Sequence, residues 1–332
     1  MKKYKNVLVL GKFYGLHLGH LYLINTALSQ SEMVHVIITH NSSQSIPGEV
    51  RFDALKSCYD KVPNIKIYCV SDEGLPAYDY DCETLDEFYS YWIPLVYSQI
   101  DSLDAVFTSE NYGDDFARYL GVEHVLVDKE RKIVPISGTM VRNDPFKNWN
   151  FIPDSMKPFF VKRIAIMGPE SVGKSTLTKN VSNNLGTNFV TEYGRLIYEI
   201  NNSITIDDFI PISKGRQEIE DWMIKFSKKY LICDTEDITT YLFSKMYCPD
   251  EYQKVEPYFL NVLKTKPKYD LYILLKPDCE GVQDGTRKFL EERWNHYEVI
   301  KSYLINYGCN FVEIGGDWNE RYKKSLNLIS EL

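Results

Sequence analysis

Short runs of apolar residues alternate with helical patterns along most of the chain. In two places such a run ends in a glycine-containing turn that opens a helix: residues 7–10 before GKFYGLHLGH, and residues 163–167 before GPESVGKS. Continuous apolar runs without alternation are typical of strands that are buried on both faces of a parallel sheet. The pattern therefore predicts α/β domains with parallel sheets.

Further strands and helices give the two halves of the chain a similar design. We expect strands at residues 34–39, 65–70, 104–108 and 124–127, and in the second half at 188–191, 230–233, 271–275 and 310–314. Helices are expected between them, for example at 85–99 and 213–228.

The length of 332 residues is sufficient for two domains, each with its own core. Residues 148–158 contain two prolines and show no clear periodicity, which is typical of a connection between domains. We therefore predict a first domain at 1–150, a linker at 151–160 and a second domain at 161–332.

The charge and cysteine content exclude several classes of protein. A net charge of −8 without a basic run argues against nucleic acid as the main partner, although a few local cations suffice to bind metabolite anions. The 7 cysteines include no CxxC pair, which argues against a disulfide framework and a zinc site. No apolar stretch approaches the roughly 20 residues of a membrane span. We expect a cytoplasmic protein without a membrane partner.

The decapeptide GKFYGLHLGH at residues 11–20 joins a predicted strand to a predicted helix, where backbone N–H groups and the helix dipole favour an anion. His17 and His20 lie three residues apart, on one face of the helix start, and Gly19 between them allows a ligand to approach closely. Their imidazole N–H groups can stabilise charge that develops on a phosphate, and Lys12 adds a cation. Two ordinary surface histidines in a glycine-rich turn are the alternative.

The same decapeptide resembles the pattern GxFxPxHxGH of the nucleotidyltransferase superfamily, with Gly11, Phe13 and Gly19 in the matching positions. Gly15 stands where that pattern has proline, which suggests a looser turn. A second piece of the superfamily pattern, ISxTxxR, is matched by ISGTMVR at residues 136–142.

The residues of ISGTMVR suit a phosphate site at a helix start. Ser137 or Thr139 can cap the helix, and Arg142 can place its forked guanidinium on a triphosphate. A simple cap with a solvated arginine is the alternative for this segment alone. Two matching pieces about one domain apart favour a nucleotidyltransferase, in which catalysis consists mainly of positioning and charge stabilisation.

The octapeptide GPESVGKS is a complete P-loop, G-x-x-x-x-G-K-[ST], between a predicted strand and a predicted helix. Lys174 is expected to reach the terminal phosphates of a nucleotide, and Ser175 to ligate Mg²⁺. The other residues that we expect to contact the nucleotide are Gly168, Glu170, Ser171, Val172, Gly173 and Thr176.

Two carboxylates follow strands near the P-loop. Asp234 ends the strand YLICD, the place of the second Mg²⁺ ligand of a P-loop protein, although a capping aspartate is the alternative. Glu192 belongs to TEYGR, where a carboxylate can accept the proton of a substrate hydroxyl. We take Glu192 as the first candidate base and Asp234 as the second, while an ion pair of Glu192 with Arg195 is an equally simple explanation. Arg287, in a glycine-bearing loop, is a candidate for a lid over ATP, with a solvated charged helix as the alternative for the residues beyond it.

A nucleotidyltransferase motif followed by a P-loop kinase motif is a rare combination. It resembles the NadR-type family of bifunctional nicotinamide-nucleotide adenylyltransferases and ribosylnicotinamide kinases over roughly residues 6 to 320. Besides GPESVGKS, the stretches TSENYGDDFARYL, VPISGTMVRNDP, TEYGR and CDTEDITT carry the resemblance. The chain begins directly at its first predicted strand, so we expect no helix-turn-helix and no repressor role.

The resemblance implies a Rossmann-like nucleotidyltransferase domain followed by a P-loop kinase domain. The kinase would phosphorylate nicotinamide riboside (NR) to nicotinamide mononucleotide (NMN), and the first domain would join NMN to the AMP of ATP to give NAD. In this scheme ATP and Mg²⁺ serve both sites, His17 and His20 stabilise the transition state, and Lys12 and Arg142 neutralise the triphosphate. Glu110, Tyr112 and Gly113 would lie near the nucleotide.

An aromatic face is expected beside the cationic nicotinamide ring in each pocket. The candidates are Trp92, Tyr193 and Trp222, with core packing as the alternative for each. Other open explanations are a kinase and nucleotidyltransferase pair for flavin or pantetheine phosphate, and a nucleotide-sensing regulator with one or both sites inactive. The sequence also leaves open whether the chain forms a homo-oligomer.

Overall fold

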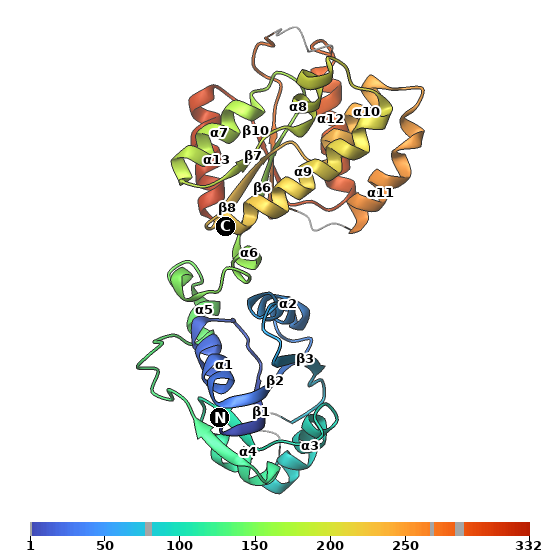
Figure 1. Ribbon diagram of the computed structural model, residues 1–332. Helices are drawn as coiled ribbons and strands as arrows, with labels where there is room; N and C mark the ends of the chain where they lie inside the picture. Colours follow the sequence, from blue (N-terminus) through green and yellow to red (C-terminus); the bar gives the residue numbers. More distant parts are fainter. Residues whose placement is uncertain (1, 77–81, 266–268, 283–288) are drawn as a thin grey trace. The chain divides into compact units, whose positions relative to one another are not determined.

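The computed structural model describes residues 2–76, 82–265, 269–282 and 289–332. The chain divides into two compact units, Met1–Phe160 and Val161–Leu332. In each unit the strands form one parallel sheet with helices packed against it (Figure 1). The α/β fold class with two parallel-sheet domains, predicted from the apolar runs, is therefore confirmed.

The first unit contains five parallel strands in the order β3-β2-β1-β4-β5. The strands are β1 (Tyr4–Gly11), β2 (Ser31–His40), β3 (Ile65–Ser71), β4 (Ala105–Thr108) and β5 (Glu123–Leu126). The helices are α1 (Leu18–Gln30), α2 (Gly48–Cys58), α3 (Leu85–Tyr97), α4 (Gly113–Leu120), α5 (Gly138–Asn143), the 3-10 turn η1 (Trp149–Phe151) and α6 (Lys157–Phe160). The strand order reverses between β1 and β4, and ligands of such sheets bind beyond the carboxyl ends of the strands at this point.

The second unit also has five parallel strands, in the order β10-β9-β6-β8-β7. The strands are β6 (Lys162–Met167), β7 (Phe189–Val190), β8 (Tyr230–Asp234), β9 (Leu271–Leu275) and β10 (Phe311–Ile314). The helices are α7 (Lys174–Leu185), α8 (Tyr193–Asn201), α9 (Phe209–Met223), α10 (Asp237–Tyr247), α11 (Glu256–Thr265), α12 (Arg293–Asn306) and α13 (Trp318–Ser330), with 3-10 turns η2 (Ile206–Asp208), η3 (Ile224–Phe226) and η4 (Tyr252–Lys254).

The central strand β6 explains why the apolar runs do not alternate. Ile164 and Ile166 pack on one face of the sheet with Leu177 of α7, whereas Ala165 and Met167 pack on the other face with helices α10 and α12 (Figure 1). Because both faces are covered, every position from 164 to 167 is buried. Burial of one such side chain stabilises the fold by about 1.5–3 kcal/mol, so the strand tolerates no polar substitution on either side.

The helix predicted at 213–228 begins earlier and ends earlier, as α9 followed by η3. Pro211 lies in the first turn of α9, where a missing N–H leaves no hydrogen bond unmade. The helix predicted at 85–99 is α3, and the Thr84 hydroxyl caps it by accepting from the Glu87 N–H at 3.1 Å. None of the described helices combines the length and the apolar character that crossing a bilayer requires.

Residues 151–160, which the sequence suggests as a linker, cluster with the first unit. Ile152 and Met156 are buried, and the Ser155 hydroxyl donates to the Ala54 carbonyl at 2.7 Å, which ties the segment to α2. The two prolines therefore mark an irregular but packed segment, because burial of its apolar side chains does not require helical or strand periodicity.

Candidate active sites

The histidines of the first motif lie at the start of α1, directly after β1. Their rings stack with centroids 3.7 Å apart, and the backbone N–H of His17 donates to His20 Nδ1 at 3.3 Å. Phe13 contacts the His20 ring with a centroid separation of 4.9 Å. A Cβ atom on Gly19 would lie 2.9 Å from His17 Nδ1, so this position needs glycine for steric reasons.

Burial keeps both imidazoles uncharged at neutral pH. The pKa of His17 is lowered to about 4 by desolvation and by the charge of Arg131. The pKa of His20 is lowered well below its usual value by desolvation, by His17 and by Arg131. His17 Nδ1 is buried without a hydrogen-bond partner among the described residues. The pair therefore presents neutral imidazoles, which can donate or accept one hydrogen bond at each free nitrogen.

The two histidines line a pocket of about 70 Å³ together with Gly19, Glu110, Arg131 and Gly138. Arg131 Nη2 lies 3.2 Å from Glu110 Oε1, so a cation and a carboxylate face the same space as the imidazoles. Sequence reasoning missed Arg131, since nothing in the charged run DKERK distinguishes it from its neighbours. A cation at this wall favours an anionic ligand such as a phosphate.

The turn after β1 packs closely against the start of α5, which brings the two pieces of the first motif together. A Cβ on Gly15 would lie 2.7 Å from the Gly138 carbonyl oxygen, and a Cβ on Gly138 would lie 2.5 Å from the Tyr14 carbonyl oxygen. Arg142 donates to that Tyr14 carbonyl at 2.5 Å, and its guanidinium lies 4.1 Å from the Tyr14 ring centroid. Gly15 therefore marks a tight turn, not the looser one that the missing proline suggests.

The capping prediction for this helix holds for Ser137, whose Oγ accepts from the Met140 N–H at 3.2 Å. Thr139 is exposed and accepts from Arg142 Nη2 at 3.1 Å. The guanidinium of Arg142 is thus fixed at two points and points back to the turn after β1.

The φ angle of Gly15 is +90°, which proline cannot adopt and which strains any other residue. We predict that Gly15→Ala destabilises the first unit by about 3 kcal/mol, because strain of about 1–2 kcal/mol adds to the clash with Gly138. Gly74→Ala is the matched control, since Gly74 has φ +76° with nothing within 4 Å of a Cβ, so it should show the strain alone. Urea unfolding of both variants measures the difference, and equal losses would contradict the packing argument.

Arg51 of α2 holds the same turn by a hydrogen bond to its backbone, and the sequence analysis did not identify this residue. Its side chain is 0% exposed and donates to the backbone carbonyls of Lys12 at 2.5 Å and Thr39 at 3.3 Å. Its exact partners come from segments far apart in the sequence, so no local pattern could single it out. The Lys12 side chain itself is exposed and does not line the pocket. Gly11 and Phe13 do not line it either, although the Phe13 ring contacts His20.

The other residues predicted near the first nucleotide are divided between the pocket and the core. Glu110 lines the pocket, but Tyr112 and Gly113 do not. The Tyr112 hydroxyl donates to the Leu10 carbonyl at 3.1 Å, and a Cβ on Gly113 would overlap the His124 ring. Trp92 packs against Phe88 beside the core and donates from Nε1 to the Pro76 carbonyl at 3.1 Å, which matches the core-packing alternative.

The P-loop of the second unit joins β6 to α7 through three residues with positive φ: Gly168 at +147°, Ser171 at +59° and Gly173 at +83°. Lys174 is 8% exposed and donates to the Pro169 carbonyl at 2.8 Å. The loop borders a cavity of about 300 Å³. The predicted nucleotide residues Glu170, Ser171, Gly173, Lys174, Ser175 and Thr176 line this cavity, whereas Val172 is buried beneath the loop.

Asp234 lies at the carboxyl end of β8, which pairs with β6, so its carboxylate comes next to the P-loop. It is 2% exposed and accepts a hydrogen bond from the Ser175 hydroxyl. Desolvation and the nearby Glu192 raise the pKa of Asp234 to about 6, against the opposing effects of Lys174 and Ser175. A cation bound beside this carboxylate would stabilise its ionised form.

Glu192 follows β7 and lines the same cavity as Lys174 and Ser175. Arg195 Nε lies 3.7 Å from Glu192 Oε2, so the ion pair considered from the sequence is present, and both side chains still border the cavity. Tyr193 also lines the cavity, and its ring packs on Gly215, where a Cβ would lie 2.5 Å from Cε1.

Trp222, the remaining aromatic candidate, does not line the cavity. It is 59% exposed on α9, and its ring contacts Phe226 with ring centroids 4.9 Å apart. Arg287 lies outside the described residues. Glu170 is held by the Tyr247 hydroxyl at 2.7 Å and by the Phe289 N–H at 3.2 Å, so it orders the cavity wall.

Arg321 of α13 holds the P-loop by a hydrogen bond to its backbone, and the sequence analysis did not identify this residue either. It is 1% exposed and donates to the carbonyls of Val172 at 2.8 Å and Lys276 at 2.9 Å. Trp318 of the same helix lies against Gly173, where a Cβ would overlap its ring. The Arg321–Val172 and Trp318–Gly173 contacts join segments more than 140 residues apart, which a sequence pattern does not reveal.

A family model for the AAA domain matches residues 163–321, and one for the citrate lyase ligase C-terminal domain matches residues 14–132. The trifunctional NAD biosynthesis/regulator protein NadR of Escherichia coli (strain K12) is 30% identical, with 98% of this chain and 82% of the relative covered. The same protein of Salmonella typhimurium (strain LT2) is 30% identical, with 100% and 84% covered.

Two solved structures share the fold across almost the whole chain. A NadR protein in complex with NR has a TM-score of 0.79 at 22% identity, covering 98% of this chain and 96% of that one. A NadR protein in complex with NAD and AMP-PNP has a TM-score of 0.78 at 21% identity, covering 100% and 96%. Together with the near full-length sequence relatives, this confirms the resemblance found in the motifs: the chain belongs to the NadR family of NAD biosynthesis proteins.

Proposed function

We propose that this chain makes NAD in two ATP-dependent steps, one in each unit. The second unit phosphorylates the 5′-hydroxyl of NR to give NMN and ADP. The first unit transfers AMP from ATP to NMN and releases pyrophosphate. The observation that carries the proposal is that each sheet places a phosphate-binding motif, a cation and polar catalytic candidates at one carboxyl edge.

In the kinase cavity each residue has a separate role that follows from its position. Lys174 and the P-loop N–H groups hold the ATP phosphates, and Glu192, which lines the same cavity, accepts the proton of the substrate hydroxyl. Tyr193 offers an aromatic wall to the acceptor. The Glu192–Arg195 contact at 3.7 Å orients the carboxylate.

The oxygens of Ser175 and Asp234 fit Mg²⁺, because they are adjacent hard donors: Ser175 borders the cavity, and Asp234 is buried beside the P-loop. We propose that they hold this ion. Bound there, Mg²⁺ supplies charge neutralisation for the terminal phosphoryl oxygens. Asp234 is then the metal ligand, which leaves Glu192 as the base.

In the first unit, the neutral His17 and His20 stabilise charge on the phosphates, with Arg131 as a cation at the same wall. The reaction needs no covalent intermediate, because the attacking NMN phosphate is already a nucleophile. We propose that Arg142 contacts the triphosphate through donors that its bonds to Tyr14 and Thr139 leave available.

The direct test is to incubate the purified protein with ATP, Mg²⁺ and NR, and to follow NMN and NAD by chromatography. We expect NMN first and NAD after it. NMN without NAD would restrict the proposal to the kinase, and no product from NR or from added NMN would overturn the nicotinamide assignment. Turnover of FMN or phosphopantetheine in place of NMN would favour the flavin or pantetheine explanation, and binding without turnover would favour a regulator.

A further inference from the structure

One buried arginine lines the kinase cavity without being part of the phosphate-binding motif. Arg216 lies on α9 and is 2% exposed. Phe209, Ile212 and Arg216 are spaced i, i+3 and i+7, so they share one face of the helix, and all three line the cavity. The face therefore combines two apolar side chains with one charged group.

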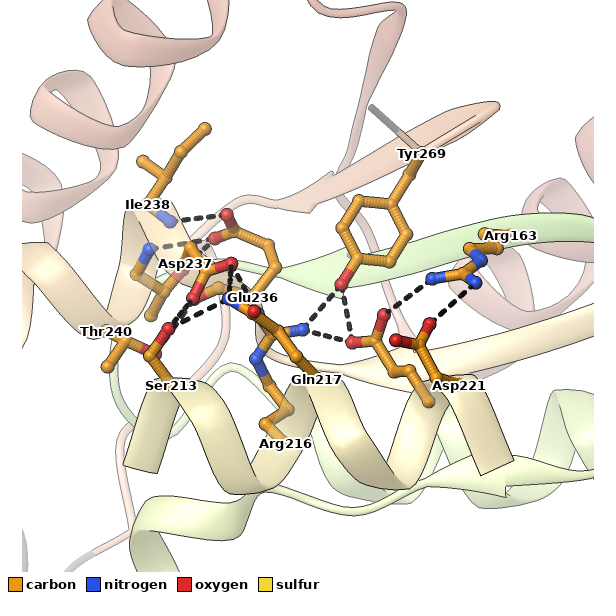
Figure 2. A network of polar contacts seen from close by, with 12 residues as sticks. Arg163, Ser213, Arg216, Gln217, Asp221, Glu236, Asp237, Ile238, Thr240 and Tyr269 are labelled. Carbon is orange, nitrogen blue, oxygen red and sulfur yellow. Dashed lines mark hydrogen bonds and ion pairs between the residues drawn. The ribbon is translucent and has the colours of Figure 1, made fainter. Parts of the chain in front are cut away.

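Both terminal nitrogens of Arg216 contact polar side chains of the second unit (Figure 2). Nη1 donates to the Tyr269 hydroxyl at 2.7 Å and to Glu220, and Nη2 lies 2.6 Å from Asp237 Oδ2. Arg163 joins the same network through Glu220 at 3.5 Å and Asp221 at 3.0 Å. Formally two arginines face three carboxylates, so the network has an excess of negative charge.

The third guanidinium nitrogen of Arg216, Nε, takes no part in this network. Nε is buried and has no hydrogen-bond partner among the described residues, and it carries no dashed line in Figure 2. An unsatisfied buried donor is costly, so a native structure keeps one where a ligand supplies the acceptor. Since Arg216 lines the cavity, the acceptor belongs to the molecule that occupies it.

The surrounding wall defines the chemistry of that molecule. Phe209 and Phe243 line the cavity with Tyr193, which suits a flat ring. A cationic ring is tolerated beside Arg216 because Glu220 and Asp237 already neutralise the guanidinium. For the same reason a carboxylate on the ring gains little from Arg216 and is repelled by the two buried carboxylates.

We propose that Arg216 Nε donates to the carboxamide oxygen of the pyridinium riboside, and that the acidic network behind it selects the neutral amide over a carboxylate. Arg216 is then a specificity-determining residue of the kinase site. The inference rests on the proposed kinase function and adds which group of the acceptor is recognised, and by which atom.

Three acceptors test the proposal on the unmodified protein: NR, the pyridinium riboside without a ring substituent, and nicotinic acid riboside. We expect kcat/KM for NR to exceed that of each analogue by about 10- to 100-fold, the value of a hydrogen bond from a charged donor. A difference of less than about threefold from the unsubstituted analogue, or a preference for the carboxylate, would overturn the proposal.

The Arg216→Lys variant tests whether Nε is the atom that donates to the carboxamide. The lysine ammonium takes the place of the guanidinium carbon between Glu220 and Asp237, and a methylene replaces Nε. We expect kcat/KM for NR to fall about 10- to 100-fold, chiefly through KM, while the unsubstituted analogue changes by less than about threefold. Arg163→Lys is the matched control, since it alters the same network without lining the cavity, and its preference should stay unchanged.

The outcomes separate this inference from the proposed function. Absence of phosphate transfer from ATP to any acceptor by the unmodified protein would contradict the kinase assignment. Transfer to NR with equal losses for both acceptors in Arg216→Lys would leave the kinase intact and make Arg216 purely structural. If the variant does not fold, as judged by circular dichroism, the three-acceptor comparison still decides.

Discussion

Asp234→Asn is expected to lower the kinase activity by about 10³-fold in kcat/KM while making the protein more stable. The activity falls because the site loses the buried carboxylate that we propose as a Mg²⁺ ligand, and one charge-stabilising contact in a water-poor site is worth about 4 kcal/mol. NR phosphorylation at saturating ATP and Mg²⁺ measures this loss, and NAD formation from NMN in the first unit serves as the internal control.

The gain in stability follows from the raised pKa of Asp234. The group has a pKa of about 6 in the folded protein and near 3.8 in the unfolded chain. Above pH 6 the folded state therefore carries a buried charge that the unfolded state solvates better, at a cost of about 3 kcal/mol. Below pH 4 both states are protonated and the cost disappears.

We therefore expect Asp234→Asn to raise the free energy of unfolding by about 1–3 kcal/mol at pH 7.5 and by much less at pH 5, without nucleotide or metal. Thermal unfolding at the two pH values measures the difference. Asp221→Asn is the control, because this carboxylate is 62% exposed and lies outside the cavity. A gain that is independent of pH would show that burial of the Asp234 charge is not the cause.

His20→Ala is expected to lower NAD formation from NMN by about 10²- to 10³-fold with no change in NR phosphorylation. The neutral ring at the wall of the first pocket is the hydrogen-bonding group that we assign to the developing phosphate charge, and one such group is typically worth this factor. Chromatography of NMN and NAD, with each substrate added separately, measures both activities in one preparation.

The pH profile gives this prediction a second readout. Because burial lowers the pKa of His17 to about 4 and the pKa of His20 well below its usual value, the adenylyltransferase rate should not fall between pH 7 and 6 through their protonation. His35→Gln is the control, since this buried histidine contacts Tyr68 and does not line the pocket. A rate that follows a group with pKa near 6.5 would mean that a charged imidazole takes part.

Much of the fold and the location of both sites follow from contiguous residues. The strands are predicted most directly where both faces of the sheet are covered, because such an apolar run has no polar positions to interrupt it, as 164–167 illustrates. Gly168, Gly173 and Gly19 predict turns from the local sequence alone, because tolerance of positive φ and the lack of a Cβ are properties of glycine itself. The two motifs also identified the family.

The tertiary structure alone decided which charged and aromatic side chains serve the sites. Arg51, Arg216 and Arg321 are buried because carbonyls and carboxylates from distant segments surround them, and an arginine has the same sequence signature whether it is buried or solvated. Trp92 and Trp222 were equally plausible as ring-stacking residues, yet one packs on the core and the other is largely exposed. Local sequence encodes strands, turns and motifs, whereas burial and partnership arise only when segments far apart in the chain meet.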